Sequence, residues 1–230
     1  MSKKAVVLLS GGLDSAVTLY FARKHGFKCF CIIFDYGQRH SREIDSAKKI
    51  ASAASYPYKI IKFKLAWGGS SLLDKKSKIP HSKDRLNSIP STYVPARNII
   101  FLSLALSYAE AIKAEAIFIG AHSQDYSGYP DCRPAFYKAF AKIINVGTKA
   151  GVEGKAVKVF TPLINKTKAE IIRLGEGLSV PFQFSWSCYQ GGRRPCGKCD
   201  SCYFRAKGFK EAGIEDPSIT GSRQQATCCI

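Results

Sequence analysis

Two groups of residues in this sequence have the types and spacing that bind phosphate and metal ions. The first is Ser10-Gly11-Gly12-Leu13-Asp14-Ser15, which follows a short apolar run and precedes a helical pattern. Glycine lets a backbone approach an oxyanion without a Cβ in the way, and the next helix offers free N–H groups and the positive end of its dipole. The Ser10 and Ser15 hydroxyls add donors, and Asp14 could hold Mg²⁺ or cap the helix. The loop therefore predicts a phosphate-binding site.

This loop differs from two well-known phosphate-binding motifs. The spacing and the lysine of the Walker loop G-x-x-x-x-G-K-[ST] are absent, and so is the dinucleotide-binding G-x-G-x-x-G. An ordinary strand-to-helix turn capped by Asp14 is the alternative, and two glycines alone would fit it. The full string S-G-G-x-D-S at a first strand–helix turn is much more specific and favours phosphate binding.

The second group comprises four cysteines within 15 residues: Cys188, Cys196, Cys199 and Cys202. Their short gaps, with Gly197 permitting a tight turn, let consecutive thiolates converge on one ion. Four thiolates suit a closed, tetrahedral, structural zinc site, and we expect one zinc ion per chain. An iron–sulfur cluster and cysteines that carry sulfur in catalysis remain alternatives. Disulfides are disfavoured in a reducing compartment.

Five short apolar runs, rich in β-branched residues, alternate with helical patterns. Runs such as Val6–Leu9 do not alternate with polar residues, which is typical of strands buried on both faces of a parallel sheet. The predicted strands cover residues 5–9, 29–34, 58–63, 116–120 and 156–160, and the predicted helices cover residues 15–25, 41–54, 97–113 and 134–149. This order predicts a doubly wound α/β parallel sheet with right-handed crossovers, which binds ligands beyond the carboxyl ends of its strands.

The C-terminal part of the chain differs in composition from the rest. Residues 167–170, Thr-Lys-Ala-Glu, have capping-box spacing and predict a short helix after the fifth strand. From Ser185 onward the sequence becomes rich in Cys, Gly and Arg. We therefore expect a nucleotide-binding α/β domain over residues 1–184 and a small cysteine-rich, zinc-binding appendage over residues 185–230.

The chain is strongly basic, with 35 Lys+Arg against 17 Asp+Glu and a formal charge of +18. Such a charge indicates an anionic ligand or surface and carries no information about the fold. Residues 74–85, five basic and two acidic, belong to a Gly-, Ser- and Lys-rich stretch over residues 65–92, which we interpret as a surface loop rather than a lid. The best apolar stretch, Ile99–Ala109, has eleven residues with two serines and is too short to span a membrane. The first apolar run has five residues and is too short for a signal peptide. We expect a soluble, cytoplasmic protein.

Three further sequence strings indicate which protein family this chain resembles. They are Phe34-Asp35-Tyr36-Gly37-Gln38-Arg39-His40, Tyr93-Val94-Pro95-Ala96-Arg97-Asn98 and Asp125-Tyr126-Ser127-Gly128-Tyr129-Pro130-Asp131-Cys132-Arg133. The loop string resembles the signature of the PP-loop ATP pyrophosphatases, which have an adenine-nucleotide α-hydrolase-like fold. With the three strings and the cysteines, the chain resembles the QueC-type 7-cyano-7-deazaguanine synthase family from Val6 to about Pro217. One departure is Ala96, where we expect glycine.

The resemblance implies a carbon–nitrogen ligase of queuosine biosynthesis that converts 7-carboxy-7-deazaguanine and ammonia to 7-cyano-7-deazaguanine. Two ATP would yield two AMP and two diphosphate. The carboxylate is adenylated, ammonia displaces AMP, and the amide oxygen is adenylated in turn before AMP leaves. The implied cofactors are structural Zn²⁺ and ATP with Mg²⁺. The implied partners are the small-molecule substrate, free ammonia and a second copy in a homodimer, with no membrane and no obligatory nucleic acid.

The resemblance also assigns site residues. The expected catalytic residues are Ser10, Asp14, Ser15 and Arg97. The expected ATP-binding residues are Leu8, Leu9, Ser10, Gly11, Gly12, Leu13, Asp14, Ser15, Ala16 and Val17. The expected substrate-binding residues are Tyr36, Arg97, Asp125, Asp131 and Arg133. Arg97 would grip a carboxylate or phosphate bidentately, and Asp131 or Asp125 would accept hydrogen bonds from the guanine-like edge. The alternatives are a surface helix start for Arg97 and a turn cap for Asp131.

Two other functions use the same residues. A tRNA thiolase would combine this loop with a basic surface and cysteines that carry sulfur. A nucleic-acid-binding zinc-ribbon protein would retain the metal site without activity. The string from Ser127 to Arg133, with the aspartates around it, suits a free base better than a folded RNA and favours the synthase.

Overall fold

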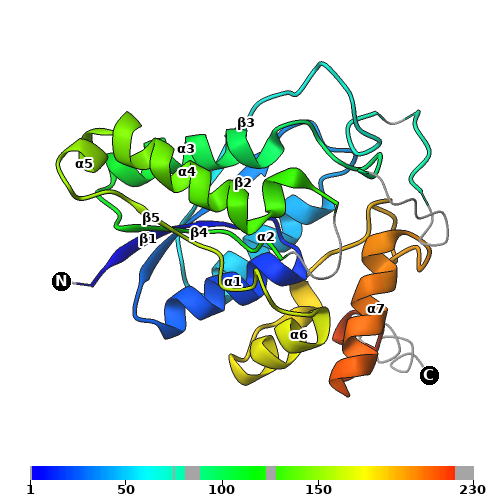
Figure 1. The fold of residues 1–230 in the computed structure, drawn as a ribbon. Coiled ribbons are helices and arrows are strands. Elements are labelled where there is room, and N and C mark those ends of the chain that lie inside the picture. Colours follow the sequence, from blue (N-terminus) through cyan, green and yellow to red (C-terminus); the bar gives the residue numbers. More distant parts are fainter. Residues whose placement is uncertain (1, 75, 81–88, 123–127, 221–230) are drawn as a thin grey trace.

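Five parallel strands form the centre of the molecule in a computed structural model that describes residues 2–74, 76–80, 89–122 and 128–220. The strands are β1 (Lys4–Leu8), β2 (Lys28–Asp35), β3 (Tyr58–Lys62), β4 (Ala116–Phe118) and β5 (Lys158–Phe160). Their order is β3-β2-β1-β4-β5, and each neighbouring pair is parallel (Figure 1). The strand order reverses between β1 and β4, so the switch point, where open α/β sheets bind ligands, lies at the carboxyl end of β1.

The strand β1 is buried on both faces, as its unbroken apolar run predicts. Ala5 and Val7 pack into the core on one face of the sheet, and Val6 and Leu8 pack into the core on the other. Because successive side chains of a strand point to opposite faces, one short run contributes to both cores.

Helices cover both faces of the sheet. The helices α1 (Leu13–Lys24), α2 (Arg42–Ala53) and α6 (Lys168–Gly177) pack on one face, and α3 (Arg97–Ala111) and α4 (Pro134–Gly147) pack on the other. Figure 1 shows α3 and α4 above the strands and α1 and α6 below them. The short α5 (Lys149–Val152) and the 3-10 turns η1 (Pro130–Cys132) and η2 (Phe182–Phe184) complete this part of the chain. The predicted doubly wound α/β fold is confirmed.

The first residues of two helices show one sequence prediction that holds and one that does not. The helix α6 begins with the predicted capping box: the Thr167 hydroxyl accepts from the Glu170 N–H, and the Glu170 carboxylate accepts from the Thr167 N–H at 2.8 Å. The helix α1 begins two residues earlier than predicted, with Gly12 as N-cap and no side-chain capping bond. Asp14 lies inside the first turn, so its expected alternative role as a helix cap is wrong.

The C-terminal region packs against the α/β layers. Its helices are α7 (Asp200–Ala212) and α8 (Pro217–Thr220), and α7 lies along α6 (Figure 1). The buried Arg205 on α7 forms a bidentate ion pair with Asp216 and donates to the Ser185 hydroxyl at 2.8 Å. The division of the chain after residue 184 remains a prediction. None of the described helices has the length and apolar character needed to cross a bilayer.

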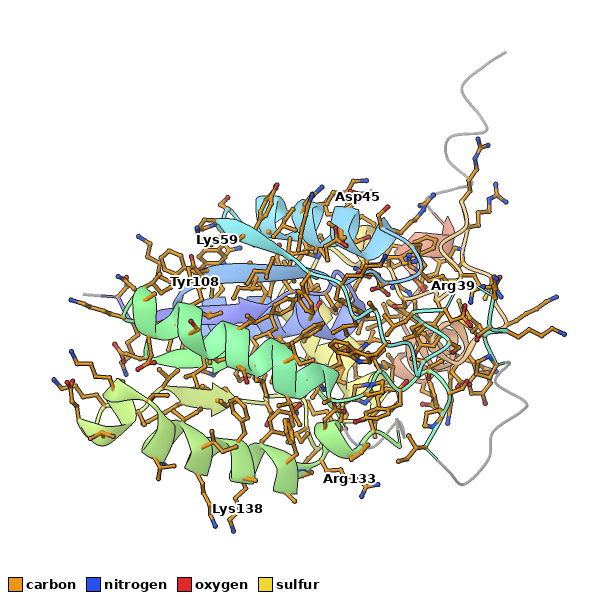
Figure 2. The ribbon with its side chains drawn as sticks, turned by 90° about the horizontal axis from the view of Figure 1, so that it is seen from above. Arg39, Asp45, Lys59, Tyr108, Arg133 and Lys138 are labelled. Atoms are coloured by element: carbon orange, nitrogen blue, oxygen red, sulfur yellow. The ribbon has the colours of Figure 1, made fainter. Side chains whose placement is uncertain are left out.

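The excursion between β3 and α3 contacts the C-terminal region. The Arg39 guanidinium, labelled in Figure 2, donates to the Ser77 carbonyl at 2.7 Å. Ile79 is buried against Trp186 and the cysteine cluster. This contact differs from the expected solvated loop, because the described part of the excursion covers apolar surface that lies far away in the sequence. Residues 75 and 81–88 lie outside the described residues.

Candidate active site

The phosphate loop joins β1 to α1 in a conformation that requires glycine. Gly11 has a φ of +84°, and a Cβ there would overlap the backbone carbonyl of Glu43 on α2. The Ser10 and Ser15 hydroxyls lie 3.1 Å apart, and the Ser10 hydroxyl accepts from the Gly12 N–H at 3.3 Å. These donors and the N-terminus of α1 converge at the carboxyl end of β1, as expected for a phosphate-binding loop.

Asp14 belongs to a cluster of three ionisable residues beside this loop. The Lys168 ammonium lies 2.8 and 3.0 Å from the two carboxylate oxygens of Asp14, and His122 Nε2 lies 3.4 Å from one of them. Burial alone would raise the pKa of Asp14, but Lys168 and His122 together hold it well below its usual range. Asp14 is therefore ionised, and a cation stands at the phosphate loop.

Neither Lys168 nor His122 is among the residues predicted from the sequence. Lys168 opens α6, where the positive end of the helix dipole disfavours a cation, so its position was a signal that could have been noticed. His122 follows β4 and carries no comparable local signal. The two residues reach Asp14 only through the packing of α6 and β4 around α1.

Two pockets meet at the phosphate loop. The first, which we call the β2 pocket, has a volume of about 230 Å³ and contains side chains from the ends of β1 and β2. The second, which we call the α7 pocket, has a volume of about 270 Å³ and contains side chains from the C-terminal region. The β2 pocket is lined by Leu9, Phe34, Tyr36, Gln38 and Phe101, among others, and the α7 pocket by Thr92, Tyr129, Lys168, Trp186, Tyr189, Asp200 and Phe204, among others.

Arg97 and Glu43 stand where the two pockets join, because both line both pockets. Arg97 opens α3, and its guanidinium donates to the Tyr36 hydroxyl at 3.5 Å. Arg97 is part-buried between the pockets, and the alternative of a surface helix start does not hold. Burial raises the pKa of Glu43 to about 7, although the Arg97 guanidinium acts to lower it. Glu43 is not among the sequence-predicted residues, because its helical position gives no sign that it faces a pocket.

The structure brings together only part of the expected substrate-binding set. Tyr36 is buried beside Arg97, with its ring against Phe101 at a centroid distance of 5.3 Å. Asp131 is buried away from both pockets, and its carboxylate accepts from the Asn98 N–H at 3.1 Å, which satisfies the N-terminus of α3. Arg133 is exposed and points outward in Figure 2. Asp125 lies outside the described residues.

The string that contains Asp131 contributes other residues to the α7 pocket. Tyr129 lines this pocket, and its hydroxyl lies 2.6 Å from the Thr92 hydroxyl. Cys132 lines both pockets, and the Asn98 amide donates to its sulfur at 3.4 Å. This string therefore lies beside the two pockets, although the side chains that line them differ from those expected.

The four predicted cysteines form one compact cluster. The sulfurs of Cys188, Cys196, Cys199 and Cys202 all lie within 4.8 Å of one another. Four sulfurs bound at ~2.3 Å in a tetrahedron lie ~3.8 Å apart. The Cys196 and Cys202 sulfurs are 3.9 Å apart. Each cysteine of a four-iron cluster binds a different iron atom, which would separate the sulfurs further, so the spacing fits a single ion.

The surroundings of the cluster also suit a metal thiolate. Backbone N–H groups donate to the Cys188 sulfur from Gln190 at 3.4 Å and from Cys196 at 3.3 Å. Hydrogen bonds from the Cys199 and Cys202 thiols lower the pKa of Cys188 well below its usual range. All four cysteines have free thiols, and none forms a disulfide in the described part of the chain.

The cysteine cluster is connected to the phosphate loop through Trp186. The Trp186 backbone N–H donates to the Gly11 carbonyl at 2.9 Å, and its indole N–H donates to the Cys188 carbonyl at 2.8 Å. The Arg42 guanidinium stacks over the indole ring at 4.7 Å. The region that carries the cysteines thus forms one wall of the α7 pocket.

A further cavity, of about 990 Å³, lies elsewhere. It is at the amino ends of β4 and β5, and lysines from several elements surround it. It contains none of the motif residues, and parallel α/β sheets bind their ligands at the opposite, carboxyl ends of the strands. The geometry therefore places the chemistry at the two smaller pockets.

The chain is similar in sequence to proteins of one known family. The sequence model of a family described as "Queuosine biosynthesis protein QueC" matches residues 4–213. The chain belongs to the QueC family. The QueC family relatives include a 7-cyano-7-deazaguanine synthase from Trichodesmium erythraeum, 51% identical over 93% of this chain and 99% of that protein. Another, from Acetivibrio thermocellus, is 54% identical over 93% of this chain and 96% of that protein.

A solved structure similar to this QueC family protein is the U34-tRNA thiolase NcsA from Methanococcus maripaludis. Its TM-score is 0.49 at 21% sequence identity, and the match covers 100% of this chain and 74% of that chain.

Position 96 of this QueC family chain has the backbone conformation of a glycine. Ala96 is the N-cap of α3 and has φ 54° and ψ 22°, in the left-handed region. Its N–H donates to the Tyr93 hydroxyl at 3.1 Å, and its carbonyl accepts from the Ile100 N–H. The alanine therefore retains the conformation that aims Arg97 at the pockets, at a cost in backbone strain.

Proposed function

We propose that this QueC family protein is a 7-cyano-7-deazaguanine synthase, an ATP-dependent carbon–nitrogen ligase of queuosine biosynthesis. It converts 7-carboxy-7-deazaguanine and ammonia to the nitrile, and releases two AMP and two diphosphate. The observation that carries this proposal is the pair of pockets that join at the phosphate loop, with Arg97 between them. One pocket suits a nucleotide and the other suits a flat base, and their junction suits transfer of an adenylyl group.

In this proposal, ATP binds in the β2 pocket and at the phosphate loop. The Ser10 and Ser15 hydroxyls, the glycine N–H groups and the α1 N-terminus are placed to hold the phosphates. Asp14 would hold Mg²⁺, which supplies charge neutralisation at the phosphates when it is bound. Lys168 lies beside Asp14 and is placed to stabilise the charge that grows on the departing diphosphate. Donors arranged in advance around a leaving group lower the energy of the transition state more than that of the ground state.

In this proposal, the substrate binds in the α7 pocket. Tyr129, Tyr189 and Phe204 provide aromatic surface for a flat base. Arg97 is placed to hold the carboxylate at the junction, close to the α-phosphorus of ATP. A carboxylate oxygen attacks that phosphorus and diphosphate leaves. Ammonia then attacks the acyl carbon, and AMP leaves with the carboxylate oxygen.

The second half of the reaction uses the same loop. The amide oxygen attacks the α-phosphorus of a second ATP, and diphosphate leaves again. Two protons and AMP then leave, and the carbon–nitrogen triple bond remains. Carboxylate to nitrile removes two oxygens from one carbon, so each oxygen needs one adenylation.

We assign zinc to the four-cysteine site as a structural ion, because four thiolates leave no open coordination position. Zinc when bound supplies a cross-link that holds the wall of the α7 pocket. We expect free ammonium as the nitrogen source and a homodimer in solution, which light scattering can test. We expect a cytoplasmic location, because a reducing compartment keeps the seven described cysteines as free thiols.

The function is tested by incubating the protein with ATP, ammonium and 7-carboxy-7-deazaguanine and identifying the product by mass spectrometry. Each nitrile should appear with two AMP and two diphosphate and without ADP. Without ammonium the reaction should stall at the acyl-adenylate, and with limiting ammonium the amide should accumulate. Appearance of ADP and phosphate would contradict the mechanism.

The phosphate loop is tested separately by substitution. Asp14→Ala should slow both adenylations by ~10²–10³-fold, because one loop serves both. Asp45→Ala is the matched control, since Asp45 is an exposed acid on α2. Unimpaired amide formation by Asp14→Ala would overturn the role of the loop.

Turnover should not depend on added tRNA, whereas strict dependence on tRNA would favour a thiolase.

A further inference from the structure

The proposed function needs a proton acceptor at the junction of the pockets. Ammonia is protonated to ammonium at neutral pH, and the ammonium ion has no lone pair with which to attack an acyl carbon. A group at the junction must attract this cation and remove one proton close to the acyl-adenylate. A carboxylate does both, provided that its pKa lies near the working pH.

Three carboxylates line the two pockets among the residues that the structure describes: Asp14, Glu43 and Asp200. Asp14 is paired with Lys168 and lies beside His122, and because its pKa is held well below its usual range it is a weak base. Asp200 lines only the α7 pocket, in the first turn of α7. Glu43 lines both pockets and stands at their junction.

The position of Glu43 is rigidly set relative to the phosphate loop. Its backbone carbonyl lies against Gly11, so close that no side chain fits at that glycine. Arg97 is the cation that faces Glu43 from α3, and Tyr36 and Tyr189 face it from the other walls. Cys188 is the further titratable group that acts on Glu43. Within the described part of the chain, no hydrogen bond holds the Glu43 carboxylate.

We propose that Glu43 binds ammonium at the junction of the pockets and accepts its proton. This inference rests on the proposed function. One N–H proton moves to the carboxylate, and the freed lone pair forms the bond to the acyl carbon. The bond from that carbon to the AMP oxygen breaks, and the electron pair leaves with AMP. A second nitrogen proton is lost to solvent and leaves the neutral amide. Burial, which raises the pKa of Glu43 to about 7, suits this exchange near neutral pH.

The test compares two nucleophiles on Glu43→Gln, which keeps the shape of the side chain. Hydroxylamine is a far weaker base than ammonia, is mostly neutral at pH 7, and needs no proton acceptor before attack. Ammonium-dependent amide formation should fall by ~10²–10⁴-fold. Hydroxamate formation from hydroxylamine, and diphosphate release during adenylation without ammonium, should both stay within a few fold of wild type. Asp45→Asn, on the exposed side of the same helix, is the control.

Three outcomes are distinguishable. If Glu43→Gln slows adenylation itself, Glu43 serves ATP or substrate binding and the inference is wrong. If hydroxamate formation falls as far as amide formation, the residue has no role in proton removal and the inference is again wrong. If the wild-type protein forms no acyl-adenylate at all, the proposed function fails first. A folded variant is verified by an unchanged thermal unfolding curve at pH 5, where Glu43 is protonated.

Discussion

The backbone N–H of Trp186 donates a hydrogen bond to the carbonyl of Gly11 over 2.9 Å. Trp186 lies two residues before Cys188, the first cysteine of the cluster, and Gly11 is the turn residue of the phosphate loop. The indole N–H of Trp186 also donates a hydrogen bond to the Cys188 carbonyl. The cysteine cluster and the phosphate loop are thus connected by one residue, although Gly11 and Cys188 are 177 positions apart in the chain.

This connection predicts how loss of a metal ligand propagates. Cys199→Ser should abolish stoichiometric zinc binding, lower the melting temperature and raise the KM for ATP. The reason is that the segment from Trp186 to Cys188, which supports Gly11, is no longer held by the metal ion. Elemental analysis, thermal unfolding and diphosphate release measure the three effects. Cys29→Ala is the control, since Cys29 is buried in β2 and should leave the zinc content unchanged. A brown, iron-containing wild-type protein would refute the zinc assignment.

A second prediction concerns the support of Lys168. Gly208 on α7 packs so closely on the Lys168 side chain that a Cβ there would overlap it. Gly208→Ala should therefore displace the Lys168 ammonium from Asp14 and slow adenylation about tenfold, with an overpacking cost of about 1–3 kcal/mol in unfolding free energy. Pre-steady-state diphosphate release and chemical denaturation are the measurements. Ala206→Ser, at an exposed position of α7, should change neither. Unchanged adenylation in a stably folded Gly208→Ala would show that α7 does not position Lys168.

A third prediction concerns the strained helix start. Because Ala96 has a φ of 54°, Ala96→Gly should raise the free energy of unfolding by about 1 kcal/mol and leave turnover intact. Ala139→Gly, at an exposed position inside α4, is the matched control and should lower the same quantity by about 1 kcal/mol. Denaturant titration compares both with wild type. Destabilisation by both substitutions would contradict the strain at position 96.

A fourth prediction uses the shifted pKa of Glu43. The folded protein raises it from the ordinary value of 4.5 to about 7. The folded state thus binds more protons between these values, and the contribution of this carboxyl to stability is complete below about pH 4.5 and is lost as the pH rises through 7. Glu43→Gln should accordingly stabilise the fold at pH 8 by about 1–3 kcal/mol and by little at pH 5. Denaturant unfolding at the two pH values checks this, with Asp45→Asn, at an exposed position of α2, as the control. Equal stability changes at both pH values would contradict the shift.

Several features of this protein could be predicted because they are encoded over short distances in the chain. The unbroken apolar run of β1 predicts a strand buried on both faces, and the Thr167–Glu170 pair predicts a capping box. The S-G-G-x-D-S string specifies the turn that follows β1. The four cysteines converge because their gaps are short, so few arrangements of the backbone between them are possible.

Other features depend on which distant elements pack together, and local patterns do not contain that information. Lys168 reaches Asp14 across 154 positions because α6 packs on α1, and Glu43 faces the pockets because α2 lies against Gly11. Asp131 was expected to face a substrate, yet its carboxylate accepts a hydrogen bond from the Asn98 N–H at the start of α3. A short carboxylate side chain can serve either purpose. Its local sequence does not distinguish them, because the choice depends on whether a helix end or a pocket lies beside it in the folded protein.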